Sequence, residues 1–107
     1  MKDLKMLVNE YLYNCKMMKQ LDKKTLKAYR IDLSQFGVFA ERHPEPINKV
    51  TLTEYIALLH ATYQPRTAKR KIATLKAFFH YLLVEELIES NPFDKINTSK
   101  YFIWVTT

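Results

Sequence analysis

Four segments of the chain carry apolar residues at helical spacing. Residues 3–20 repeat them at i, i+3, i+4, i+7, i+8 and i+11, which forms one helical face, at Leu4, Leu7, Val8, Tyr11, Leu12 and Cys15. Similar faces follow in residues 22–43, 51–63 and 64–84. The pattern predicts four amphipathic helices. We expect the fourth to break near Glu85 and a short final turn to end at Ser90.

Local signals mark where these helices begin and end. Asp22 is the predicted N-cap of the second helix, which should stop near His43 because the prolines of residues 44–46 cannot continue it. Thr51, with a glutamate three residues later, forms a predicted capping box for the third helix. Pro65 suits the first turn of the fourth helix, where its missing N–H costs nothing.

Five positions qualify the simple pattern. Gly37 lies mid-helix on an apolar arc, where it either lets another helix approach closely or marks a local weakness. Ile31 and Val38 fall off that arc, as ordinary exposed residues or as a second contact surface. Cys15 is expected to be a buried thiol that packs as a small apolar group. Lys71 is expected to extend its stem along the apolar margin and reach water with its ammonium.

Composition narrows the fold class to an all-α, compact bundle of four to five helices. The 107 residues suffice for one domain with a real core, and one glycine and four prolines favour helices over tight-turned sheets. No apolar run is long enough to span a membrane. The single cysteine suits a reducing cytosol, so we expect a cytoplasmic protein. The net charge of +6 suggests an anionic partner.

The positive charge gathers on two of the predicted helices. On the fourth, basic residues occupy an arc of about 120° opposite the apolar side, at Arg66, Lys69, Arg70 and Lys76. No acidic residue follows Arg66 until Glu85. The second helix has a basic flank of its own, at Lys23, Lys27 and Arg30. Such faces fit a polyanion such as DNA, although basic runs are commonly just solvated surface.

Three segments resemble motifs of the tyrosine recombinases, the phage-integrase family. Residues 22–39 are similar to T-x-x-x-Y-x-x-D-L-x-x-F, through Thr25, Tyr29, Asp32, Leu33 and Phe36. Residues 67–82 are similar to T-x-x-R-x-x-x-x-L-x-x-F-x-x-Y-L, through Thr67, Arg70, Leu75, Phe78, Tyr81 and Leu82. Asn91-Pro92-Phe93 resembles the N-P-x motif that closes the core-binding domain. The order and spacing of the three motifs agree with that domain.

The resemblance implies a SAM-like helical domain that forms one half of a C-shaped clamp around duplex DNA. The helices that start near Asp22 and Gln64 would lie across the major groove. The family's catalytic half carries an Arg, a Lys, a His-x-x-Arg motif and a nucleophilic Tyr; no histidine here has an Arg three residues on. We therefore expect no catalysis by this chain alone, a binding domain over residues 1–96, and a tail over residues 97–107.

The tail itself is uncharged and aromatic from Tyr101 to Thr107. Three interpretations stay open: a linker or truncated start of a second domain, an artefact of truncation, or an apolar plug that docks on the bundle.

The candidate DNA contacts follow from the basic faces and the resemblance together. We expect most of them to be phosphate contacts, and Arg70 to pair with a base edge or to clamp another phosphate; the full set is Lys23, Lys24, Thr25, Lys27, Arg30, Arg66, Thr67, Lys69, Arg70, Thr74 and Lys76. No cofactor, metal or small-molecule substrate is expected. The expected partners are double-stranded DNA and sister recombinase protomers.

Two rival classes remain. One is a helical interaction module for an acidic partner or a sister protomer. The other is a helix-turn-helix repressor, which the proline-containing, glycine-free connection before the fourth helix disfavours.

Overall fold

The computed structural model describes residues 3–43 and 47–96. It contains four α-helices, α1 (Leu4–Met17), α2 (Lys23–Glu41), α3 (Lys49–Thr62) and α4 (Pro65–Val84), followed by the 3-10 helix η1 (Pro92–Lys95). No strand occurs in the described ranges, so the expected all-α bundle of four to five helices is confirmed. None of the described helices is both long and apolar enough to cross a membrane. The tail, residues 97–107, lies outside the described residues.

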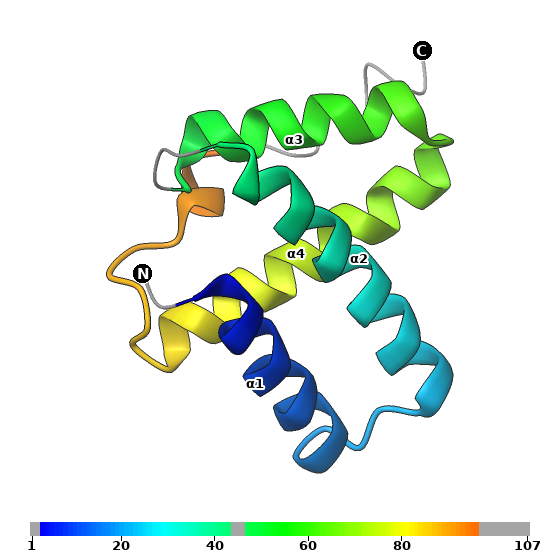
Figure 1. Cartoon of the computed structure of the whole chain (residues 1–107), viewed down its shortest axis with the longest axis vertical. Coiled ribbons are helices and arrows are strands. Elements are labelled where there is room, and N and C mark those ends of the chain that lie inside the picture. The colour runs from blue at the N-terminus through cyan, green and yellow to red at the C-terminus, as the bar shows by residue number, and fades with distance from the viewer. Residues whose placement is uncertain (1–2, 44–46, 97–107) are drawn as a thin grey trace.

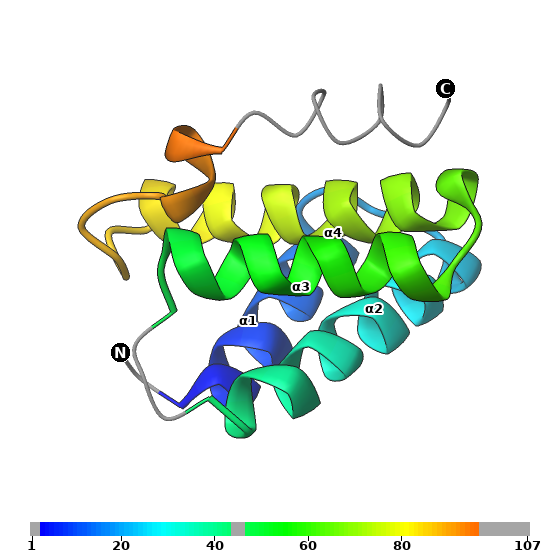
Figure 2. The same cartoon turned by 90° about the horizontal axis from the view of Figure 1, so that it is seen from above.

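The helices pair into two hairpins that stack on each other. In Figure 1, α1 runs antiparallel to α2, and α3 leads through a tight connection into α4. Figure 2 shows the α1–α2 hairpin beneath the α3–α4 hairpin. Helices α2 and α4 cross near the middle of the molecule and contact each other there (Figure 1). This crossing brings the two predicted basic helices together.

The predicted apolar arcs form the core. All six members of the α1 arc are buried or packed against the core, and the thiol of Cys15 is fully buried as expected. Aromatic rings join the two layers, since the Tyr11 ring lies 5.5 Å from that of Phe78, and Phe36 lies 5.9 Å from Phe79. Edge-to-face rings at such separations add to the stabilisation from apolar burial. Ile31 and Val38 are exposed.

The capping predictions are confirmed for α2 and α4 and wrong for α3. Asp22 Oδ1 accepts a hydrogen bond from the Thr25 amide at 2.8 Å, and Pro65 is the first residue of α4. Helix α3, however, begins two residues before Thr51. Its N-cap is Asn48, whose Oδ1 accepts from the Thr51 amide at 3.1 Å. Asparagine is as good an N-cap as threonine or better, and this frees Thr51 to be buried inside the first turn.

The ends of two helices also differ from prediction. Helix α1 stops at Met17 rather than Gln20, and Gln20 takes a positive φ of 52° that ends helical geometry. The expected final turn follows Asn91 instead of preceding it, as η1. Asn91 Oδ1 accepts from the Phe93 amide at 3.0 Å, and the Phe93 ring packs 5.6 Å from that of Phe79. The motif Asn-Pro-Phe therefore caps a turn that closes the core over α4.

Gly37 does not provide a close helix approach. A Cβ placed on it would meet nothing within 4 Å, so that interpretation is wrong. The residue instead lines a groove of about 470 Å³ between α1 and α2. The local-weakness interpretation remains, since a helical glycine has more backbone freedom to lose on folding than alanine does.

We expect Gly37→Ala to raise the free energy of unfolding by about 0.5–1 kcal/mol, because the added methyl group meets no clash and the unfolded chain loses freedom. Urea unfolding followed by circular dichroism measures the change. The reverse substitution at an exposed helical site, Ala73→Gly, should lower stability by a similar amount. A loss of stability in Gly37→Ala would contradict the explanation.

Candidate nucleic-acid interface

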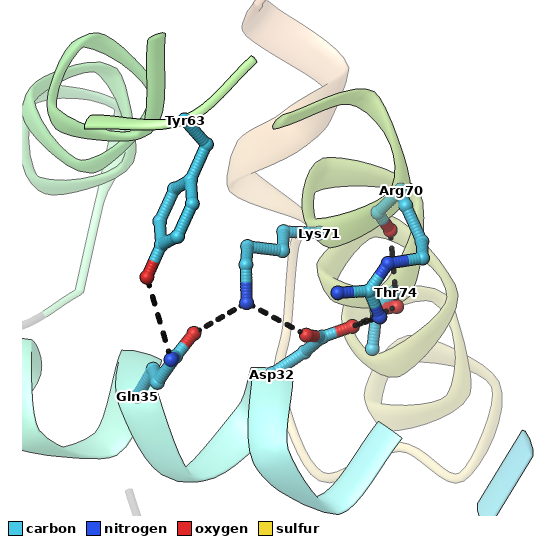
Figure 3. A network of polar contacts seen from close by, with 6 residues as sticks. All are labelled: Asp32, Gln35, Tyr63, Arg70, Lys71 and Thr74. Carbon is cyan, nitrogen blue, oxygen red and sulfur yellow. Dashed lines mark hydrogen bonds and ion pairs between the residues drawn. The ribbon is translucent and has the colours of Figure 1, made fainter. Parts of the chain in front are cut away.

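A buried carboxylate lies where α2 and α4 cross. The side chain of Asp32, on α2, is only 1% exposed. Its Oδ2 accepts from Arg70 Nη1 at 2.8 Å and lies 3.0 Å from the hydroxyl of Thr74. Its Oδ1 accepts from the ammonium of Lys71 at 3.0 Å (Figure 3). Three residues from two successive turns of α4 thus bind both carboxylate oxygens of Asp32.

The network continues from Lys71 toward α3. Lys71 Nζ also donates to Gln35 Oε1 at 2.6 Å and lies 4.8 Å from the centre of the Tyr63 ring. The Gln35 amide in turn donates to the Tyr63 hydroxyl at 3.4 Å (Figure 3). Lys71 is 4% exposed, so the expectation that its ammonium reaches water is wrong. A buried anion, a side-chain carbonyl and a ring face replace the water it would have found.

The cluster carries an excess of positive charge. One carboxylate, Asp32, forms ion pairs with two basic side chains, Arg70 and Lys71. The Arg70 side chain is 48% exposed while those of Lys71 and Asp32 are 5% and 1% exposed, so the excess charge faces solvent through Arg70.

The cluster also affects a neighbouring tyrosine, Tyr55. Its burial is the main cause that raises its pKa to about 12, and the nearby Tyr63 hydroxyl and Asp32 carboxylate act in the same direction.

The α2 candidates do not all face the same way. Lys23, Lys24 and Lys27 are exposed and Thr25 is half-buried. The backbone amide of Thr25, which donates to Asp22, lowers the pKa of that N-cap carboxyl. Arg30 turns away from α4 toward α1, where its Nη1 lies 3.4 Å from Asn9 Oδ1. The structure therefore separates Arg30 from Arg70.

The α4 candidates comprise four exposed cations and two threonines. Arg66, Lys69, Arg70 and Lys76 are exposed and Thr67 is half-buried. Thr74 is 3% exposed, and its hydroxyl lies within hydrogen-bonding distance of both Asp32 Oδ2 and the backbone carbonyl of Arg70, at 3.0 and 3.1 Å. The Thr74 hydroxyl therefore serves the α2–α4 crossing in this structure.

The basic helices present their N-termini on the same side of the molecule, at the right edge of Figure 1. No acidic residue occupies the first turn of either helix, which instead holds Lys23 and Lys24 on α2 and Arg66 on α4. Gln64, the N-cap of α4, makes no side-chain capping bond. A helix N-terminus carries partial positive charge and free amides, which attract anions such as phosphate. At α2 the carboxylate of Asp22 already binds a first-turn amide, so this argument applies to the uncapped N-terminus of α4.

Within the described residues, no three His, Cys, Asp or Glu side chains gather in a way that could hold a metal ion. The geometry is that of a polar, cationic surface over an apolar core.

Comparison with known proteins identifies the family. A family model for the phage integrase, N-terminal SAM-like domain, matches residues 8–86. The chain belongs to this family. The tyrosine recombinase of Agathobacter rectalis is 45% identical over 97 residues, which cover 90% of this chain and 32% of that protein. Tyrosine recombinase XerC of Staphylococcus saprophyticus is 36% identical over 87 residues, which cover 78% of this chain and 29% of that protein.

This SAM-like domain thus spans about a third of the length of the curated recombinases that it matches. The resemblance to the phage-integrase family is confirmed, and the matched residues 8–86 include the first two of the three motifs. No solved structure was found to match the chain.

Arg70 and Thr74 are among the DNA contacts predicted from sequence, but their common partner is not. Asp32 enters the sequence-based prediction only as a motif position. An aspartate inside a helix, directly before the core residue Leu33, was the available signal, because such a side chain needs partners when it is buried.

The buried ion pair makes a clear stability prediction. Asp32→Asn should lower the free energy of unfolding by about 3–5 kcal/mol, because the Lys71 ammonium would stay buried without an anion. The double variant Asp32→Asn/Lys71→Met, which buries no charge there, should recover most of the loss. Urea unfolding of both variants and of Lys71→Met alone gives the coupling energy. A double variant no more stable than Asp32→Asn would refute this account.

Proposed function

We propose that this SAM-like domain is the DNA-binding part of a tyrosine recombinase and clamps duplex DNA at a recombination site during site-specific integration or recombination. The observation that carries the proposal is the cationic surface formed by α2 and α4, with no acidic residue between Arg66 and Val84, in a member of this family. Arg and Lys side chains that neutralise phosphates supply most of the affinity of such interfaces.

The uncapped N-terminus of α4 supports the same proposal. Lys24 and Arg66 lie in the first turns of α2 and α4, and both helices start at one edge of the molecule (Figure 1). The side chain of Gln64 does not cap α4, so amides of its first turn can face an anion. A DNA backbone along this edge would meet side-chain and backbone donors together.

We assign the contacts in two classes. The exposed lysines of α2 and α4, Arg66, and the hydroxyls of Thr25 and Thr67 would bind the sugar-phosphate backbone and set register. Arg70 would reach a base edge, where a guanidinium can pair with guanine through two hydrogen bonds. Arg30 and Thr74 would first have to leave Asn9 and Asp32, so they are the weakest members of the set.

We further propose that the binding domain comprises residues 1–96, with residues 97–107 as a linker to the next domain or as its start. The chain matches about a third of each relative named above. Cutting and joining of DNA would then belong to the rest of a longer recombinase, and the role of this chain would be binding.

A protein-interaction module is the second candidate, and one observation favours it. Met6, Tyr13 and Met17 are 54%, 67% and 52% exposed along one outer stripe of α1, at spacings of seven and four residues. Such side chains could contact a sister protomer or another protein. DNA titration separates this candidate from the first.

We expect the 107-residue chain to bind a duplex of about 24 base pairs in a salt-dependent manner. Fluorescence anisotropy at about 50 and 200 mM salt should give a log–log slope of roughly −0.9 for each phosphate neutralised. The double reversal Lys24→Glu/Arg66→Glu should abolish most of the affinity and of the slope, because both side chains lie on the proposed surface.

A matched pair of reversals on α1, Lys5→Glu/Lys16→Glu, changes the net charge equally at exposed positions outside that surface. It should reduce affinity much less. Equal losses in the two double variants would mean that only net charge matters. Absence of binding by the unaltered chain at about 50 mM salt would reject DNA binding and favour a protein partner.

Substitution of Arg66 and of Arg70, which lie one turn apart on α4, tests which of them contacts phosphate and which contacts a base edge. Arg66→Ala should weaken binding to all duplexes by a similar factor, whereas Arg70→Ala should also reduce discrimination between a preferred and a scrambled duplex by about 5-fold or more. Competition anisotropy with the two duplexes measures both effects. The same discrimination in both variants would place Arg70 among the phosphate contacts.

A further inference from the structure

The Arg70 guanidinium binds Asp32 through one nitrogen, Nη1. Its other N–H donors are not used by that carboxylate. Nη1 lies 2.8 Å from Asp32 Oδ2, and nearly half of the arginine side chain is exposed. A guanidinium carries five N–H donors in a rigid plane. The bond to Asp32 therefore fixes the plane at one corner while other donors can face outward from the α2–α4 crossing.

Lys71 prevents this anchor from cancelling the charge of Arg70. Its ammonium lies 3.0 Å from the other oxygen of Asp32 and is itself buried. An isolated Arg–Asp pair would be neutral, and its carboxylate would repel phosphates. Here the buried lysine neutralises the buried carboxylate, so the exposed arginine still presents a full positive charge.

The carboxylate is also held in a single orientation. The Thr74 hydroxyl lies 3.0 Å from Oδ2, the oxygen that holds Arg70, while Lys71 occupies Oδ1 (Figure 3). With partners on both oxygens, the carboxylate cannot rotate without breaking bonds inside the core. An exposed arginine without such an anchor would sample many rotamers and would lose that freedom on binding.

We infer that Asp32 is a positioning residue for DNA recognition: its carboxylate, neutralised by Lys71, holds the Arg70 guanidinium ready to meet a base edge. The inference rests on the proposed function and deepens it, because it assigns sequence discrimination partly to a residue too buried to touch DNA. Asp32 acts only through Arg70.

Removal of the carboxylate should change two separate quantities. The change in charge alters the affinity for any duplex, and the loss of positioning alters the discrimination between duplexes. Asp32→Asn adds one positive charge to the proposed surface, which by itself should tighten binding to any duplex and steepen its salt dependence. If Asp32 positions Arg70, discrimination between duplexes should fall despite the added charge. Measuring affinity and discrimination separately therefore distinguishes the two effects.

The experiment uses a background in which the fold survives. Lys71→Met keeps the Asp32–Arg70 bond, and Asp32→Asn/Lys71→Met removes it without leaving a buried charge. The probes are a duplex of about 24 base pairs enriched by the unaltered chain from a random pool and a scrambled duplex of equal composition. Anisotropy gives the ratio of the two affinities for each variant, and thermal melts confirm that each is folded.

We expect the double variant to lose about 5-fold or more of this ratio relative to Lys71→Met, with equal or tighter binding of the scrambled duplex. Glu41→Gln, which makes the same change in charge at an exposed site elsewhere on α2, should leave the ratio unchanged. An unchanged ratio in the double variant, or no preference in the unaltered chain, would overturn the inference while leaving DNA binding intact.

A second measurement needs no DNA. Nuclear spin relaxation of the Arg70 Nε–H group should report a rigid side chain in the unaltered chain and in Lys71→Met, and a mobile one in the double variant. Equal mobility in all three would overturn positioning by Asp32. Failure of the unaltered chain to bind any duplex would instead remove the proposed function and, with it, this inference.

Discussion

The buried carboxylate of Asp32 is the constraint on which the arrangement of the two hairpins depends. Apolar contacts between helices tolerate small rotations, whereas a buried carboxylate is destabilising when its charged partners move out of reach. Arg70, Lys71 and Thr74 meet Asp32 from one side of α4. Turning α4 by one residue, about 100°, would carry the lysine out of the core and the arginine away from the carboxylate. The ionic cluster therefore fixes the register in which α4 lies across α2.

The same cluster links the core to the proposed DNA surface. Its inner members contact Gln35 and, through it, Tyr63 at the end of α3, while its outer member is the half-exposed Arg70. A shift of either hairpin would move the guanidinium. A side chain that is carried by one packed helix and anchored to another, rather than carried by a loop, shares the rigidity of the core, which suits the proposed role of Arg70.

Most of the fold could be predicted because its signals are local. The apolar arcs of α1 and α4 and the caps at Asp22 and Pro65 depend on residues within one or two turns. The errors also have local causes: Asn48 and Thr51 both offer capping side chains, and the sequence does not rank them. The family can be recognised from the order and spacing of three short motifs, which lie on different elements of the fold.

The polar cluster could not be predicted in the same way, because each of its contacts between α2 and α4 joins residues 36 to 42 positions apart in the chain. A lysine beside an apolar arc usually reaches water, and nothing near Lys71 in the sequence shows that an aspartate will meet it.

At Gly37 the sequence suggests a tertiary contact that the structure does not contain. Its position on an apolar arc suggested a neighbour, yet the packing of α1 against α2 leaves open space there.

The distribution of cations on α4 bears on how the proposed complex would be built. Arg66 and Arg70 lie on the flank toward α2, and Lys69 and Lys76 lie on the other flank, with the small side chain of Ala73 between them. A major groove about 12 Å wide admits one helix, with a phosphate strand on either side. A helix with basic flanks and a small central residue can approach the base edges while each flank meets one strand. Since Arg70 is anchored on the flank nearest the crossing, the position of α2 would decide which base it reaches.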